Sequence, residues 1–388
     1  LVILGISFFI IFYLSYFGIE TKRFNNKIKE EILKDNQTLD IDLKSVKFLL
    51  KPSNLSVNVK TFEPNIFFNN QQFKLEYIKT NISLKSFINN KFSVDDLKIS
   101  TKEIKLNNII QLARSFNNST ELFILNKVIK KGFLVADINL NFDDNGKIKD
   151  DFLVNGIIKN GSLGLLNKNN INNLNLLFKV KKNEYLLEDI NATFNQIKLT
   201  SPLIKIIEQK NIFLIQAKII TNEKNFDKEL FKDLLGNNFK ELDIENINFS
   251  SENNLNFNIS KKLKISNLKL KSKISLNTLD YKNELLNIKK YLPNFQETIK
   301  LQDHKILLNY KKNQLDINGN GKLIIEDKID SLNYKIRKKN DEYNFKTNID
   351  LNKNSLLIDI LNYKKKENLS SILKLSGKYK KDKHINFN

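Results

Sequence analysis

The stretch ADINLNFDDNG, residues 136–146, decides the fold class of this chain. Its apolar residues occupy every second position, polar residues fill the positions between them, and Asp144-Asn145-Gly146 ends the run. Because successive side chains of a β-strand point to opposite faces of a sheet, this alternation predicts a strand with one apolar face. An Asn-Gly pair flanked by alternating runs is typical of a hairpin, so the next run is expected to pair antiparallel.

The same alternation recurs along most of the chain past residue 40. It predicts a mainly β protein in which residues 38–388 form one elongated, curved antiparallel sheet with a few short helices. No segment rich in Pro, Gly or Ser divides this region into domains. The apolar members of the alternating runs are candidates for the floor of an apolar groove, and we select Val57, Val59, Leu84, Ala136, Ile138, Leu140, Phe142, Leu176, Phe178, Leu255, Phe257, Ile259, Phe345 and Ile349.

The apolar face of each predicted strand must be covered, and the sequence leaves two ways of doing so. A second sheet would close the protein into a β-sandwich, which would suit a non-catalytic envelope-assembly or scaffolding protein. A curved open sheet would instead leave an apolar groove, and an exposed apolar surface of that size indicates a ligand, a partner or a membrane. Periodicity alone does not choose between the two.

The N-terminal segment LVILGISFFIIFYLSYFGI, residues 1–19, carries no charged residue. At 1.5 Å per residue, about 20 apolar residues span the roughly 30 Å core of a bilayer, so a single transmembrane anchor is predicted here. Residues 20–37 are predicted to form a juxtamembrane helix with Phe24 and Ile28 on one face. Four basic residues of this segment are candidates to contact lipid headgroups: Lys22, Arg23, Lys27 and Lys29. By the positive-inside rule they favour a cytoplasmic body, although the rule also needs the residues upstream.

Three later stretches have apolar residues at helical spacing: residues 109–130, 225–242 and 279–292, the last of which ends before Pro293. We expect these helices to cap the sheet or to interrupt it. The chain has no Met, which predicts that it is a processed or truncated product and that the sheet continues beyond its C-terminus.

Composition excludes several classes of function. The 388 residues include no Cys, which excludes disulfides, thiolate metal sites and a cysteine nucleophile, and the only histidines are His304 and His384. Asp303 beside His304 is expected to be a surface pair, and the acidic pairs Asp95–Asp96 and Asp143–Asp144 are expected to be solvated turn carboxylates. No G-x-S-x-G, P-loop or H-E-x-x-H motif is present. We therefore expect no catalytic residues, no cofactor and no metal.

The charge balance is strongly basic, with 64 Lys+Arg against 43 Asp+Glu and a formal net charge of +21. The basic residues are spread along the whole chain, and Lys, Ile and Asn dominate its composition, which is typical of an AT-rich genome. A dedicated nucleic-acid site would gather basic residues into a patch. The charge therefore indicates a solvated, lysine-rich surface, and no nucleic-acid partner is expected.

A more specific pattern lies within residues 52–100, where a strand leads into a Ser-Leu-x-Ser segment, a turn with Lys, and a second strand. The residues that carry it are Ile82, Ser83, Leu84, Lys85, Ser86, Phe87 and Ile88, the turn Asn89–Asn90–Lys91, and then Phe92, Val94, Leu97 and Ile99. This pattern resembles the N-terminal segment of the AsmA-like proteins, bacterial relatives of the chorein-type lipid-transfer proteins, although the turn has Asn where many relatives have Gly. The later β-rich part is similar in character to the YhdP-type members.

The resemblance implies a function and a location. Members of this family are anchored in the inner membrane of Gram-negative bacteria with their bulk in the periplasm. Their apolar β-groove is thought to carry phospholipid towards the outer membrane. The expected partners are therefore phospholipid and the inner membrane, and a partner at the outer membrane or elsewhere in the envelope is left open.

Overall fold

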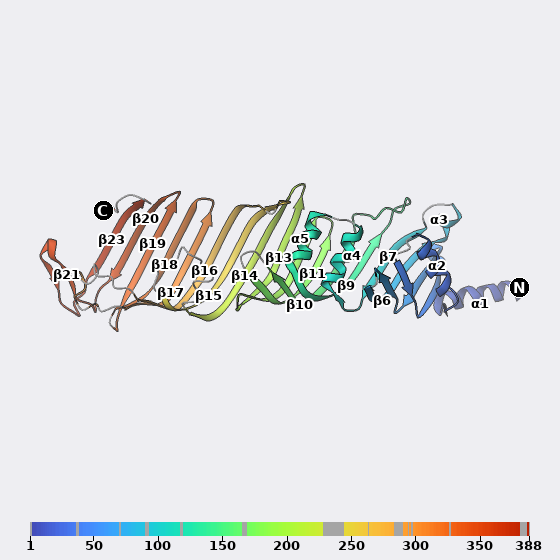
Figure 1. The fold of residues 1–388 in the computed structure, drawn as a ribbon, viewed down its shortest axis with the longest axis horizontal. Coiled ribbons are helices and arrows are strands. Elements are labelled where there is room, and N and C mark those ends of the chain that lie inside the picture. The colour runs from blue at the N-terminus through green and yellow to red at the C-terminus, as the bar shows by residue number, and fades with distance from the viewer. Residues whose placement is uncertain are drawn as a thin grey trace. The chain divides into compact units, whose positions relative to one another are not determined.

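The computed structural model describes residues 2–35, 39–69, 71–89, 93–116, 119–164, 169–227, 244–262, 264–282, 290–293, 295, 298–325, 327–380 and 386–387. Most of these residues lie in antiparallel strands and few in helices, which confirms the predicted mainly β class. Figure 1 shows these elements coloured along the chain, and contacts within the chain divide it into two units, which we describe separately. Unit 1 comprises Leu1–Phe194 and Lys205–Glu208, and unit 2 comprises Asn195–Ile204 and Gln209–Asn388.

The helical elements of unit 1 are α1 (Val2–Tyr16), α2 (Asn25–Asp35), η1 (Pro52–Asn54), α3 (Leu84–Ile88), α4 (Leu106–Phe116) and α5 (Thr120–Val128). Its strands are β1 (Ile19–Thr21), β2 (Leu39–Asp42), β3 (Ser45–Lys51), β4 (Ser56–Phe62), β5 (Asn65–Phe68), β6 (Gln71–Ser83), β7 (Val94–Thr101), β8 (Ile104–Lys105), β9 (Ile129–Asn141), β10 (Leu153–Gly164), β11 (Asn170–Lys181) and β12 (Glu184–Phe194).

The strand β13 (Ile197–Gln209) is divided between the units. Unit 2 continues with β14 (Ile212–Asp227), β15 (Ile244–Ser260), β16 (Ile265–Lys282), β17 (Thr298–Lys311), β18 (Gln314–Ile325), β19 (Lys328–Lys339), β20 (Glu342–Asp350), β21 (Leu356–Ile358), η4 (Asp359–Leu361), β22 (Tyr363–Lys365), β23 (Ile372–Lys380) and β24 (Asn386–Phe387).

The sheet of unit 1 pairs its strands antiparallel in the order β1, β3, β4, β6, β7, β9, β10, β11, β12. Directly opposed residues of antiparallel strands carry their side chains on the same face. The register therefore aligns one apolar row across β6, β7, β9, β10 and β11: Ile78, Ile99, Ile138, Val154 and Val180. The face that contains this row is the apolar face of unit 1.

The sheet of unit 2 is built in the same way, with β14 to β20 paired in chain order and β23 and β24 following β20. One apolar row crosses β17 to β20 through Leu308, Ile317, Ile336 and Phe345. The neighbouring residues along the same strands, such as Arg337, lie on the opposite, polar face. The alternation predicted from the sequence is therefore aligned across strands in both units.

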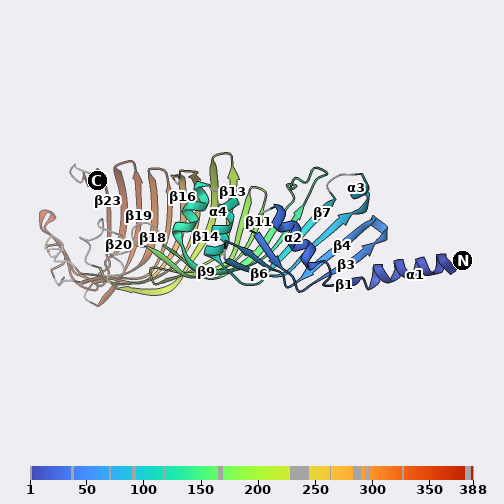
Figure 2. The same ribbon diagram turned by 45° about the vertical axis from the view of Figure 1, so that its right-hand side comes forward.

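Buried clusters lie on the apolar faces and place the helices. In unit 1, Ile28 of α2 packs against a cluster that includes Val46, while Ile109 and Leu112 of α4 pack against a cluster that includes Phe73. Figure 2 shows α2 and α4 lying against the strands of this unit. In unit 2, buried Phe226 belongs to one cluster and buried Phe295 to another, which also includes Leu323 and Ile325.

The N-terminal helix differs from the prediction for residues 1–19. The helix α1 ends at Tyr16, and Ile19–Thr21 forms β1 instead of continuing it. Gly18 takes a left-handed φ of 69°, and a Cβ there would lie 2.4 Å from the carbonyl oxygen of Phe48, so only glycine fits this close approach to β3. Among the described residues, no helix is both long and apolar enough to cross a bilayer.

The other predicted helices are partly corrected. The juxtamembrane helix predicted for residues 20–37 begins only at Asn25, because β1 and a turn precede it. The helix predicted for residues 109–130 is two helices, α4 and α5, with Ser119 capping the second by accepting the backbone N–H of Leu122 at 3.3 Å. Residues 225–227 and 279–282 are strand and not helix, and residues 228–242 and 283–289 lie outside the described residues.

Candidate functional site

The register brings most of the groove candidates onto the two apolar faces. In unit 1 these are Val57, Val59, Ala136, Ile138, Leu140, Leu176 and Phe178, and in unit 2 they are Leu255, Phe257, Ile259, Phe345 and Ile349. Phe142 follows β9 and forms an isolated bridge with Ile148. Leu84 is placed differently from the prediction, because it begins α3 and is not part of a strand.

The apolar faces are incompletely covered. Of the groove candidates, only Ala136 and Leu176 are buried, with 4% and 6% of their surface exposed, and the others are half-buried. The inner faces of two packed sheets form a filled core about 10 Å thick, in which such side chains would be buried. Half-burial over both units instead leaves apolar side chains in partial contact with solvent.

An apolar cavity of about 630 Å³ opens between α2 and the first strands of unit 1. Its lining residues come from β1, the turn before α2, α2 itself, β3, β4 and β6: Ile19, Phe24, Lys27, Ile28, Phe48, Val59 and Ile82. The rings of Phe24, directly before α2, and Phe48 meet edge to face with centroids 5.3 Å apart, which packs the start of α2 against β3. The volume lies within the range of small-molecule sites. Within the lining, Lys27 supplies the one charge.

The four headgroup candidates separate in the structure. Lys27 is brought to the cavity, and it is an exposed residue of α2. Lys29 instead forms an ion pair with Asp40 of β2, at 3.0 Å between Nζ and Oδ2. Lys22 and Arg23 are exposed in the turn between β1 and α2 and do not line the cavity. Lys27 is therefore the candidate best placed to meet an anionic group at the cavity.

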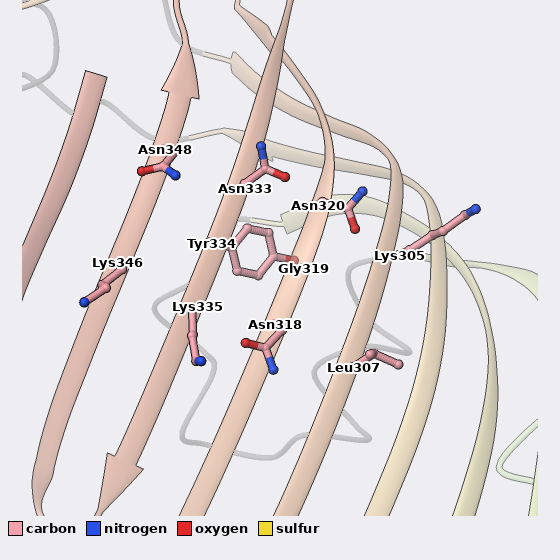
Figure 3. Close-up of a pocket in the computed structure, with 10 residues that line it drawn as sticks. All are labelled: Lys305, Leu307, Asn318, Gly319, Asn320, Asn333, Tyr334, Lys335, Lys346 and Asn348. Carbon is pink, nitrogen blue, oxygen red and sulfur yellow. The ribbon is translucent and has the colours of Figure 1, made fainter. Parts of the chain in front are cut away.

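A second depression, of about 510 Å³, lies over β17 to β20 in unit 2 (Figure 3), and Lys and Asn residues line it together with Leu307, Gly319 and Tyr334. Directly opposed residues there form a polar row of Lys305, Asn320, Asn333 and Asn348. Such side chains supply hydrogen bonds and positive charge, while the lining contains no carboxylate to pair with them. Sequence reasoning missed this row, whose only signal is Lys or Asn at the positions between apolar residues.

His304 and Asp303 do not form the surface pair that was expected. His304 is 1% exposed, and its Nε2 lies 3.0 Å from the carbonyl oxygen of Lys322. Asp303, with a left-handed φ of 54°, lies in a bulge between β17 and β18, and its carboxylate accepts from Lys322 Nζ at 2.7 Å. The bulge places the side chain of His304 in the interior, where burial lowers its pKa. No group of acidic residues and histidines within the described residues could hold a metal ion.

Comparison with known proteins identifies no relatives: no protein-family model, no curated protein and no solved structure matches the chain. The two apolar faces and the cavity beneath α2 are therefore interpreted from their geometry and chemistry.

Proposed function

We propose that this protein is a membrane-anchored lipid-transfer protein, which binds phospholipid by its acyl chains and moves it along the apolar faces of its sheets. The observation that carries the proposal is the half-burial of apolar rows such as Leu308, Ile317, Ile336 and Phe345. A water-exposed apolar surface that extends over several strands is costly unless a ligand, a partner or a membrane covers it. Acyl chains are a ligand that matches such a surface.

The proposed anchor is α1. Its side chains from Phe8 to Phe12 occupy more than one turn of helix, so they face in all directions, and all are exposed. A helix that is apolar on every side requires apolar surroundings. We place α1 in the inner membrane of a Gram-negative cell, with the two units in the periplasm, as the resemblance to AsmA-like proteins implies.

The cavity beneath α2 is the proposed entrance for lipid. It adjoins β1, which follows directly after α1, so a lipid leaving the membrane around α1 would meet Ile19 and Phe24 first. Each CH₂ group that leaves water for such a cavity contributes about 0.8 kcal/mol. Lys27 would attract the phosphate of the headgroup by its charge, which contributes roughly 1 kcal/mol near an anionic group.

Movement along the sheet follows from the uniform chemistry of the floor. The row from Ile78 to Val180 presents branched aliphatic side chains on successive strands. Such side chains hold an acyl chain through contact area and not through directed bonds, so binding energy changes little as the chain slides. The proposed direction is from the inner membrane towards the outer membrane.

The proposal is tested by placing a photo-crosslinking amino acid in the full chain at position 336, which lies on the apolar face. The matched control is position 335, whose side chain lies on the polar face of the same strand. After irradiation of cells, mass spectrometry should find phospholipid attached at position 336 and not at position 335. Equal labelling at both positions, or no lipid at position 336, would refute the proposal and would favour a closed scaffolding protein.

A further inference from the structure

Four lysines stand directly opposite one another on the polar face of unit 1. The pairs are Lys47 with Lys60 between β3 and β4, Lys60 with Lys79 between β4 and β6, and Lys79 with Lys98 between β6 and β7. We call these four residues the lysine ladder. Neighbouring strands lie about 4.8 Å apart, so the ladder places four positive charges along about 14 Å of the sheet.

The ammonium groups of the ladder are not paired with carboxylates among the described residues. The Nζ of Lys60 lies over two rings, 4.9 Å from the centroid of Phe62 and 4.8 Å from that of Tyr77. Like charges in directly opposed positions destabilise a sheet. The ladder is thus a local concentration of repulsion that an external anion would relieve.

Two carboxylates near the ladder accept hydrogen bonds from other groups. Glu20 is opposite Lys47, but its carboxylate accepts the hydroxyl of Ser45 at 2.5 Å. Asp96 lies two residues before Lys98, on the same face of β7. Its carboxylate accepts both the backbone N–H and the side-chain amide of Asn81, each at 2.8 Å. Within the described residues, neither carboxylate forms an ion pair with a lysine of the ladder.

We propose that the lysine ladder docks an α-helix of a partner protein that carries an acidic stripe, with one carboxylate on each turn. Such a stripe repeats every 5.4 Å, against about 4.8 Å for the rungs of the ladder. Over three intervals the two spacings differ by about 2 Å, which the four-carbon stems of lysine absorb. Each lysine of the ladder then meets one carboxylate of the helix.

The geometry favours this partner over a bilayer. The ladder begins on β3, the strand that pairs with β1 at the end of α1, and runs across the sheet to β7. In Figure 2, α1 projects from the edge of unit 1 at β1, so the ladder leads away from α1 and from any membrane that holds it. Such a membrane would reach Lys47 before the other three, whereas a helix lying along the ladder reaches all four.

A single-stranded nucleic acid is also a poorer fit. Proteins that bind single strands stack bases on free aromatic faces beside a basic groove. The two aromatic rings beside the ladder, Phe62 and Tyr77, have the ammonium group of Lys60 over them. A base would have to displace this group before it could stack.

The test measures binding of a fluorescent helical peptide with four glutamates at one-turn spacing to the detergent-solubilised full chain. The variant K60Q/K79Q should lower the affinity by about fivefold per lysine at low salt, since that is the upper range for an exposed ion pair. The matched control is Lys179→Gln in β11, because Lys179 stands opposite Asn155 and Leu186 and not opposite lysines. This control should bind like the unchanged protein, and added salt should weaken binding throughout.

Three outcomes would overturn the proposal: equal binding by K60Q/K79Q, equal binding of a peptide with the same glutamates scattered around the helix, or preferential binding to phosphatidylglycerol vesicles or oligonucleotide. The proposed lipid function is independent of this surface, because the ladder lies on the face of unit 1 opposite to its apolar row and position 336 belongs to unit 2. Photo-crosslinking of lipid at position 336 should therefore continue in K60Q/K79Q. If the peptide does not bind while lipid is still labelled, only the docking proposal fails. If lipid is not labelled while the peptide still binds, only the lipid proposal fails.

Discussion

Replacing Lys79 by Gln should make unit 1 more stable, although it removes a charged side chain from the middle of the sheet. Lys79 is directly opposed to Lys60 on one side and to Lys98 on the other. Two ammonium groups about 6 Å apart repel by about 0.7 kcal/mol in water. The two neighbours together then give about 1.4 kcal/mol at low salt, and about half of that remains at 0.15 M salt, where the Debye length is about 8 Å.

The stability can be measured on the full chain in non-ionic detergent, from hydrogen exchange in peptides spanning β6 and β7 as urea is raised. The control Lys179→Gln should change stability by no more than about 0.5 kcal/mol, as is usual for a surface substitution. The gain in Lys79→Gln should shrink when salt rises from 20 mM to about 500 mM, because salt screens exposed charges. A loss of stability in Lys79→Gln, or a gain that ignores salt, would show that the four ammonium groups do not repel as the register implies.

Two further predictions concern unit 2. Burial lowers the pKa of His304 in the folded state, so the fold favours its neutral form. The urea midpoint of unit 2 should therefore fall as the pH drops below about 6.5, the pKa of an unfolded histidine, towards this lowered pKa. The variant His304→Gln should lose this part of the pH dependence. Gly319→Ala would place a Cβ 2.2 Å from Cζ of Tyr334, so it should destabilise unit 2 by about 1–3 kcal/mol in urea unfolding. The double variant G319A/Y334L should recover part of that loss, and no recovery would mean that the ring is not the cause.

The faces of the strands could be predicted from the sequence because period two is a local property of the extended chain. The alternation in Ala136–Asn141 placed Ala136, Ile138 and Leu140 on one face without knowledge of any neighbour. Breaks in that local rule were missed. The helix α1 ends before Gly18, which approaches Phe48 of β3, and the bulge beside Asp303 turns His304 inward. Both depend on a strand that is distant in sequence.

The sequence by itself determined that this is a β protein whose strands each have an apolar and a polar face, since composition and periodicity express local backbone geometry. Only the tertiary structure decided which residues stand opposite one another, because the register depends on where distant strands meet. The register aligned the apolar residues into half-buried faces in each unit and brought the strands that line the cavity beneath α2 together. It also placed Lys47, Lys60, Lys79 and Lys98 side by side, so lysines that are scattered along the sequence form a concentrated charge on one face.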